Sequence, residues 1–124
     1  MKISSFWDLI VFQKAYKLSM QIYLLTKNFP FDEKYSLTDQ IRRSSRSICD
    51  NIAESWAKRI YVKAFVNKLT DALGEQFETE VWLKMSFDLQ YITGTIYDQL
   101  ITDYAEVRKM LISIIDNPDK FCKT

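Results

Sequence analysis

The 124-residue sequence contains no histidine. This absence removes Ser-His-Asp and Cys-His nucleophile arrangements, histidine-ligated zinc and the Glu-x-x-His pairs of di-iron bundles. Glycine is also scarce, with 2 residues in the chain, so glycine-rich phosphate loops are missing. We therefore predict a non-enzymatic protein, and we expect no cofactor and no metal site.

Proline and cysteine are equally scarce. With 2 Pro and 2 Gly, the chain has too few turn formers for an all-β fold. Cys49 and Cys122 lack Cys-x-x-Cys spacing, which is typical of free thiols in a reducing compartment. The sequence also lacks a secretory-type N-terminus and the run of roughly eighteen apolar residues that spans a bilayer. We expect a cytoplasmic, soluble protein that does not contact membranes.

Charges of the two signs nearly cancel. The chain has 17 Lys and Arg and 16 Asp and Glu, which gives a formal charge of +1. Any nucleic-acid-binding surface must therefore be local. Hydrophobic residues make up 48% of the chain, and 124 residues suffice for one sizeable core. Residues 1–124 are predicted to form a single domain.

Four segments repeat apolar residues at three- and four-residue steps, the spacing of amphipathic helices. The predicted helices cover about residues 5–28, 37–58, 62–92 and 96–115. Pro30 ends the first helix, Gly94 is predicted to stop the third, and Pro118 ends the fourth. Because the connections are short, we predict an all-α, antiparallel up-down four-helix bundle.

The third predicted helix carries a second apolar stripe, on the side away from its core-facing residues. Its members are Trp82, Met85, Leu89 and Ile92. A monomer would leave the stripe exposed, so we predict that it joins copies of the chain in a homo-oligomer. The alternative is that the helix turns within the domain and that loop residues such as Phe31 and Tyr35 cover the stripe.

The second predicted helix combines arginines with small polar residues. Its outer face places opposite charges four residues apart, which favours a self-neutralised, solvent-exposed surface. These pairs are Asp39–Arg43, Arg46–Asp50 and Glu54–Lys58. The alternative is a nucleic-acid-binding surface. Its candidate residues are Arg42, Arg46, Lys58, Arg59 and Lys63.

Polar residues border or interrupt the apolar faces of the second and third predicted helices. The candidates for a polar core network are Ser44, Asn51, Gln76 and Glu80. A buried carboxylate needs hydrogen-bond partners or a shifted pKa. We interpret these residues as a structural network. The alternative is a small-molecule- or metal-binding site around Gln76 and Glu80.

Motifs along nearly the whole chain point to one family. The stretches FWDLIVFQKAY, FPFDEKYSLTDQIRRSSRSICDNIAES, LTDALGEQFETE and DLQYI resemble the bacterial four-helix-bundle proteins encoded in intervening sequences of 23S ribosomal RNA genes. The central signature matches at Gln40, Arg42, Arg43, Ser47, Asn51, Ile52, Ala53 and Glu54. The chain departs from the family pattern at Ser55–Lys58 and at Glu75.

This resemblance implies an up-down four-helix bundle that assembles into ring-like homopentamers. The family is similar to the accessory protein of diversity-generating retroelements, a pentameric barrel with a basic surface that works with a reverse transcriptase and nucleic acid. The expected partners are therefore further copies of the chain and RNA or a nucleoprotein.

Overall fold

The computed structural model describes residues 2–122, and over these residues the fold is all-α. The long helices are α1 (Ile10–Thr26), α2 (Leu37–Ala57), α3 (Val62–Asp88) and α4 (Gly94–Asp116). Short 3-10 turns also occur at η1 (Phe6–Asp8), η2 (Phe31–Glu33) and η3 (Pro118–Lys120). The all-α fold class predicted from the sequence is confirmed.

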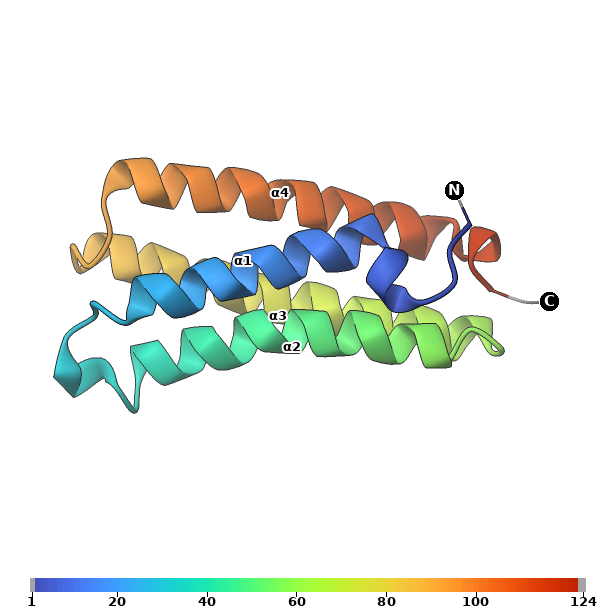
Figure 1. Cartoon of the computed structure of the whole chain (residues 1–124), viewed down its shortest axis with the longest axis horizontal. Coiled ribbons are helices and arrows are strands. Elements are labelled where there is room, and N and C mark those ends of the chain that lie inside the picture. Colours follow the sequence, from blue (N-terminus) through green and yellow to red (C-terminus); the bar gives the residue numbers. More distant parts are fainter. Residues whose placement is uncertain (1, 123–124) are drawn as a thin grey trace.

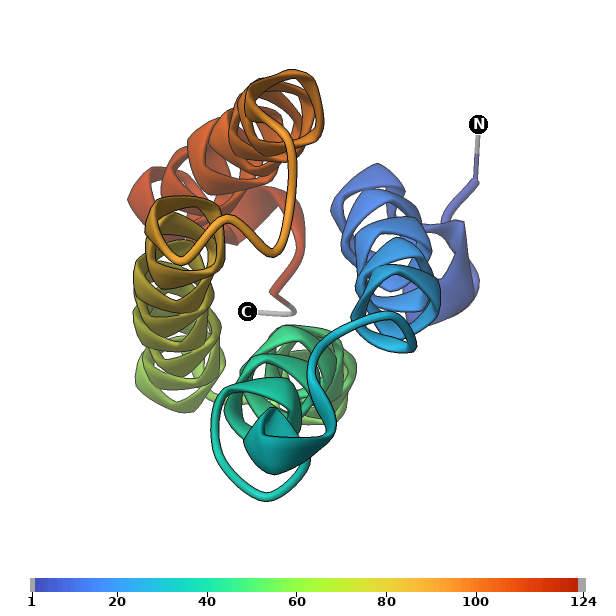
Figure 2. The ribbon, with the colours of Figure 1, turned by 90° about the vertical axis from the view of Figure 1, so that its left-hand side faces the viewer.

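The four helices pack side by side as a bundle (Figure 1). The α1–α2 and α3–α4 connections lie at one end, and the α2–α3 connection lies at the other, beside η1 and η3. Viewed along the bundle, α1 and α3 lie at opposite corners, and each contacts both α2 and α4 (Figure 2). No helix within residues 2–122 has the length and apolar character that a bilayer span requires.

The core is formed by one buried face of each helix, as the three- and four-residue spacing predicts. Burial of a large apolar side chain of this kind contributes about 1.5–3 kcal/mol. The most completely buried apolar side chains include Ile22 of α1, Ile41, Ile48 and Ile52 of α2, Phe65, Leu69 and Leu83 of α3, and Val107 and Leu111 of α4.

The first helix begins later than the sequence predicts. The Ser5 hydroxyl accepts a hydrogen bond from the Trp7 amide at 3.2 Å, and the Asp8 carboxylate accepts one from the Ser5 amide at 3.2 Å. These bonds form a capping box that closes the separate turn η1. Leu9 is extended, with ψ of 124°, so α1 starts at Ile10.

The third helix ends earlier than predicted, at Asp88. Gln90 adopts a left-handed conformation with φ of 66°. The Tyr91 amide donates to the Ser86 carbonyl and the Gln90 amide to the Phe87 carbonyl, both at 2.9 Å. This is the hydrogen-bond pattern of a Schellman motif, with Gln90 in the position that glycine usually fills.

Gly94 therefore does not stop α3 but is the first residue of α4. The hydroxyl of Thr93 caps this helix by accepting a hydrogen bond from the Ile96 amide at 3.2 Å. The sequence analysis predicted the end of α3 at Gly94 because glycine is common at helix C-termini. It did not consider Thr93 as the N-cap of the next helix.

Candidate interaction surfaces

The stripe predicted to join copies of the chain is only partly exposed. Met85 of α3 and Leu89, the residue after its end, are exposed. Trp82 is half-buried, and its indole N–H donates to the Glu78 carboxylate at 3.3 Å. Ile92 lies beyond the Schellman motif and is buried, so it is a core residue and not part of an exposed stripe.

The apolar surface of α3 instead follows a four-residue step. Its members are Phe77, Val81, Met85 and Leu89, each 44–53% exposed, and we call them the α3 strip. Phe77 and Val81 were missed because the residues were grouped by alternating three- and four-residue steps. Phe31 and Tyr35 do not cover the strip, because each of them is itself 83% exposed.

A groove of about 600 Å³ lies between the α3 strip and α4. Tyr97 and Ile101 of α4 complete its apolar lining, and Glu80, Lys84 and Asp88 of α3 also line it. All three of these charges are held in ion pairs, Lys84–Asp88 at 3.1 Å and Arg108–Glu80 at 3.6 Å. The groove therefore combines apolar side chains with charges that are already paired.

Arg42 and Arg46 take their partners from α1. Their guanidinium groups lie 4.6 Å and 5.7 Å from the centre of the Tyr23 ring. The Arg42 Nε also donates to the Thr26 hydroxyl at 2.8 Å. The sequence could not reveal these contacts, because the spacing of residues within one helix does not show which side chains of another helix lie beside it.

The ion pairs predicted within α2 are wrong. Within residues 2–122, Asp39–Arg43, Arg46–Asp50 and Glu54–Lys58 are not among the ion pairs closer than 4.0 Å. Glu54 pairs instead with Lys68 of α3 at 2.8 Å, and the hydrogen bond and charge of Lys68 lower the pKa of the Glu54 carboxyl. Neither Arg42 nor Arg46 is in an ion pair with a carboxylate of the described residues.

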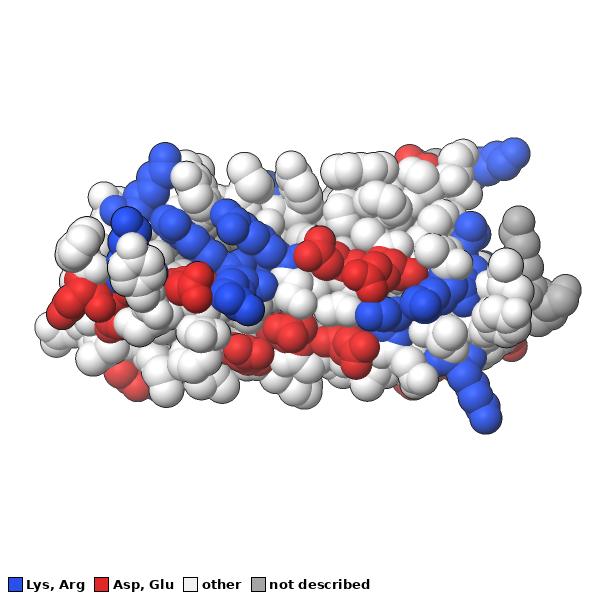
Figure 3. All heavy atoms as spheres, turned by 90° about the horizontal axis from the view of Figure 1, so that it is seen from below, with Lys and Arg blue, Asp and Glu red and all other residues white. Residues whose placement is uncertain are grey.

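The five candidate nucleic-acid-binding residues fall into two groups. Arg46 of α2 and Lys58, the residue after its end, are twelve positions apart, which corresponds to about 18 Å along a helix. Figure 3 shows basic side chains gathered toward both ends of this face, with acidic side chains between them. In the second group, the Arg59 guanidinium lies 3.5 Å from the Trp56 ring centre, and its Nε donates to the Trp56 carbonyl at 2.8 Å.

A depression of about 320 Å³ lies beside Arg42, at the end of the bundle where α1 connects to α2. Its lining combines aromatic, hydroxyl and basic side chains, and none of the lining residues is acidic. They are Tyr23, Thr26, Lys27, Phe29, Pro30, Phe31, Lys34, Thr38 and Arg42. Of these the sequence analysis singled out only Arg42 as a basic candidate, although the connection PFDEKYS carries a lysine between two aromatic residues.

The predicted polar core residues make separate contacts. The Thr79 hydroxyl donates to the Ser44 hydroxyl at 2.8 Å and thereby joins α3 to α2. The Asn51 side chain donates to the Ser47 carbonyl of its own helix at 2.9 Å. Thr79, which the sequence analysis did not name, is fully buried and is the α3 partner of Ser44.

Gln76 is fully buried and joins α3 to α4. Its amide nitrogen donates to the Tyr104 carbonyl at 2.7 Å and to the Glu80 carboxylate at 3.2 Å. Glu80 is half-buried and also faces Arg108, so it lies at the border of the core. In the described residues no three His, Cys, Asp or Glu side chains are grouped as a metal site would require.

Two buried polar atoms near this contact have no hydrogen-bond partner within residues 2–122, namely Gln76 Oε1 and the Tyr104 hydroxyl. Burial raises the pKa of the Tyr104 hydroxyl. Burial likewise raises the pKa of the Cys49 thiol to about 11. At neutral pH both groups are therefore protonated, and the Cys49 thiol is a poor nucleophile.

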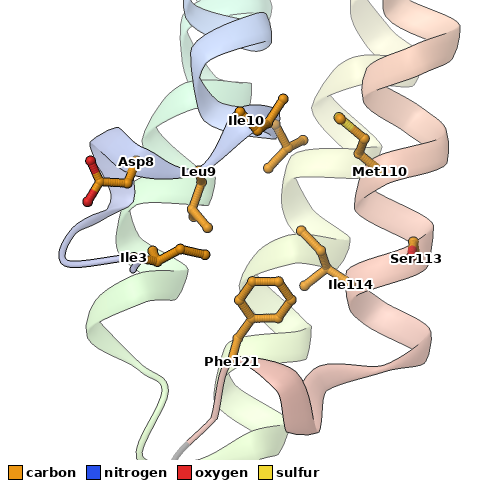
Figure 4. A pocket seen from close by; sticks show the side chains of 9 residues that line it. Ile3, Asp8, Leu9, Ile10, Met110, Ser113, Ile114 and Phe121 are labelled. Atoms are coloured by element: carbon orange, nitrogen blue, oxygen red, sulfur yellow. The ribbon is translucent and has the colours of Figure 1, made fainter. Parts of the chain in front are cut away.

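An apolar groove of about 390 Å³ lies between the start of α1 and the end of α4, at the end of the bundle that holds the α2–α3 connection (Figure 4). Ile3, Leu9, Ile114 and Phe121 converge on it, and the carboxylate of Asp8 points away. That carboxylate is held by the amides at the N-terminal side of η1. The groove can accept an apolar side chain.

Comparison with known proteins gives a family match and similar solved structures. The model of the 23S rRNA-intervening sequence protein family matches residues 7–113. The chain is also similar to a crystal structure of a protein of unknown function from the S23 ribosomal protein family of Bacteroides thetaiotaomicron. The TM-score is 0.78 and the identity 35%, over 87% of this chain and 96% of that chain. No match was found among curated proteins.

Proposed function

The chain belongs to the 23S rRNA-intervening sequence protein family, and we propose that it is a non-enzymatic, homo-oligomeric scaffold that contacts RNA or a nucleoprotein. The α3 strip carries this proposal. Monomeric proteins rarely expose contiguous apolar patches of this kind without a partner. The occupant we propose is a second copy of the same chain.

Charge supports a second copy as the occupant. From Asp71 to Asp88, α3 carries five acidic residues and one lysine, whereas α1 carries two lysines and no acidic residue. The outer face of α1 exposes Tyr16, Met20 and Leu24, and Lys17 lies beside them. An apolar face with lysine on α1 is therefore complementary to the acidic-flanked α3 strip of the next copy.

A contact between two different faces is heterologous and repeats from copy to copy. Such contacts close into rings when the rotation between copies allows it. The family resemblance sets the expected number of copies at five. A ring would leave α2 free of this contact, and α2 carries Arg42 and Arg46 for a nucleic-acid partner.

Val81→Glu tests this proposal because it places a charge in the middle of the α3 strip. We expect sedimentation velocity at micromolar concentration to show the variant as a monomer and the wild type as an oligomer. Ile60→Glu is the matched control, since Ile60 is exposed at the α2–α3 connection, away from the strip. An oligomer that persists in Val81→Glu with native helicity contradicts the proposed contact.

A further inference from the structure

We propose that the connection between α1 and α2 forms a nucleic-acid site that selects single strands. The bases would stack on Phe31 and Tyr35, and the phosphates would bind Lys27, Lys34 and Arg42. This site specifies the RNA partner of the proposed function and rests on that function.

The two rings are presented to solvent. Phe31 and Tyr35 flank Lys34 in a connection of ten residues, and at 83% exposure neither ring packs on the bundle. Figure 2 looks onto this end, and Figure 1 shows the connection projecting beyond the helix ends. Folding alone gives no reason to place two aromatic side chains there, whereas base stacking does.

The backbone that carries the rings is fixed to the rest of the bundle. Glu33, which lies between them, accepts hydrogen bonds from the Ser36 hydroxyl at 2.6 Å and the Tyr91 hydroxyl at 2.9 Å. The Phe29 ring also packs 5.3 Å from the Tyr91 ring. The segment that carries the rings is therefore ordered before binding, and this reduces the conformational entropy that is lost when RNA binds.

Basic side chains lie close to the two rings, and one of them lies over the rings. The Lys34 ammonium is 5.8 Å from the Phe31 ring centre and 5.4 Å from that of Tyr35. The Lys34 side chain is long and exposed, so it can move off a ring when a base stacks there and bind the phosphate of that nucleotide. Lys27 and Arg42 line the adjoining depression, which places further positive charge along the path of the backbone.

Exposed rings favour a single strand over a duplex. In a duplex the faces of the bases are stacked on one another, so aromatic side chains gain little from it, whereas unpaired bases can stack on them. The basic group at the α2–α3 connection differs, because among the described residues of that connection Tyr61 is the one exposed ring. A surface that binds by charge alone would show no such preference between strands.

Fluorescence anisotropy tests the site with a labelled uridine-rich RNA of about 12 nucleotides, alone and annealed to its complement. The wild type is expected to bind the single strand about tenfold more tightly than the duplex. Phe31→Leu with Tyr35→Leu should lower single-strand affinity about tenfold and leave its salt dependence unchanged, because no charge is removed. Tyr61→Leu is the matched control and should bind like the wild type.

Replacement of Lys27, Lys34 and Arg42 by Gln should reduce the slope of log affinity against log salt by about 0.7 for each cation removed. Equal affinity for both RNA forms, or a double Leu variant that binds like the wild type, overturns the single-strand site but leaves RNA binding intact. Failure of the wild type to bind either form overturns this site together with the RNA contact of the proposed function. Displacement of the RNA by poly-glutamate at equal charge concentration overturns the site in favour of an acidic protein partner.

Discussion

Glu33 is the residue that ties the α1–α2 connection to the segment following α3. Its carboxylate accepts hydrogen bonds from the Ser36 and Tyr91 hydroxyls, and these two bonds lower its pKa, with that from Ser36 the larger cause. A depressed carboxyl pKa contributes stability above its unfolded-state value, here 4.5, and this stability is lost as the pH falls through the folded-state value.

Glu33→Gln is therefore expected to destabilise the protein near neutral pH. We expect a loss of less than about 1 kcal/mol, because solvent screens a half-exposed carboxyl. Urea unfolding at about pH 7 and about pH 3 measures the effect, and the difference between variant and wild type should shrink at the acidic pH. An equal difference at both values contradicts the assigned bonds.

The Tyr104 hydroxyl is a buried polar group without a partner among the described residues. Because leaving such a group unpaired costs free energy, Tyr104→Phe is expected to raise the free energy of unfolding by about 1 kcal/mol. Tyr91→Phe is the matched control and should lower it, since the Tyr91 hydroxyl donates to Glu33. Thermal denaturation of both variants compares them, and a lower Tm for Tyr104→Phe would show that its hydroxyl has a partner.

At the scale of the helices, the end of α3 stores conformational strain. Gln90 is left-handed, a conformation that costs a side chain with a Cβ about 1 kcal/mol relative to glycine. Gln90→Gly should therefore stabilise the protein by about that amount, measured by urea unfolding. Gln90→Ala should give no such gain. A destabilised Gly variant would mean that the Gln90 side chain contributes contacts that outweigh the strain.

Periodicity predicted the helices because each buries one face, and a buried face repeats in the sequence at three- and four-residue steps. The helix ends were less predictable, since the motif at Gln90 contains no glycine and the break at Leu9 depends on a capping box that closes one turn early. The partners of Arg42 and Glu54 lie on α1 and α3. The spacing of residues within one helix does not predict which side chains of a neighbouring helix they contact.

For the molecule as a whole, the near-neutral charge hides an uneven distribution. Basic side chains gather toward both ends of the face over α2, with acidic side chains between them (Figure 3). Composition alone gives +1 and shows none of this. The same holds for the α3 strip, because its exposure depends on which way α3 turns in the bundle.

Self-association is the central claim, and the mass of the wild-type protein in solution tests it most directly. Light scattering at micromolar concentration should give a mass several times that of the 14.7 kDa chain, with five copies as the expected number. A mass of 14.7 kDa at this concentration would show a monomer whose α3 strip is open to solvent, and it would contradict the account.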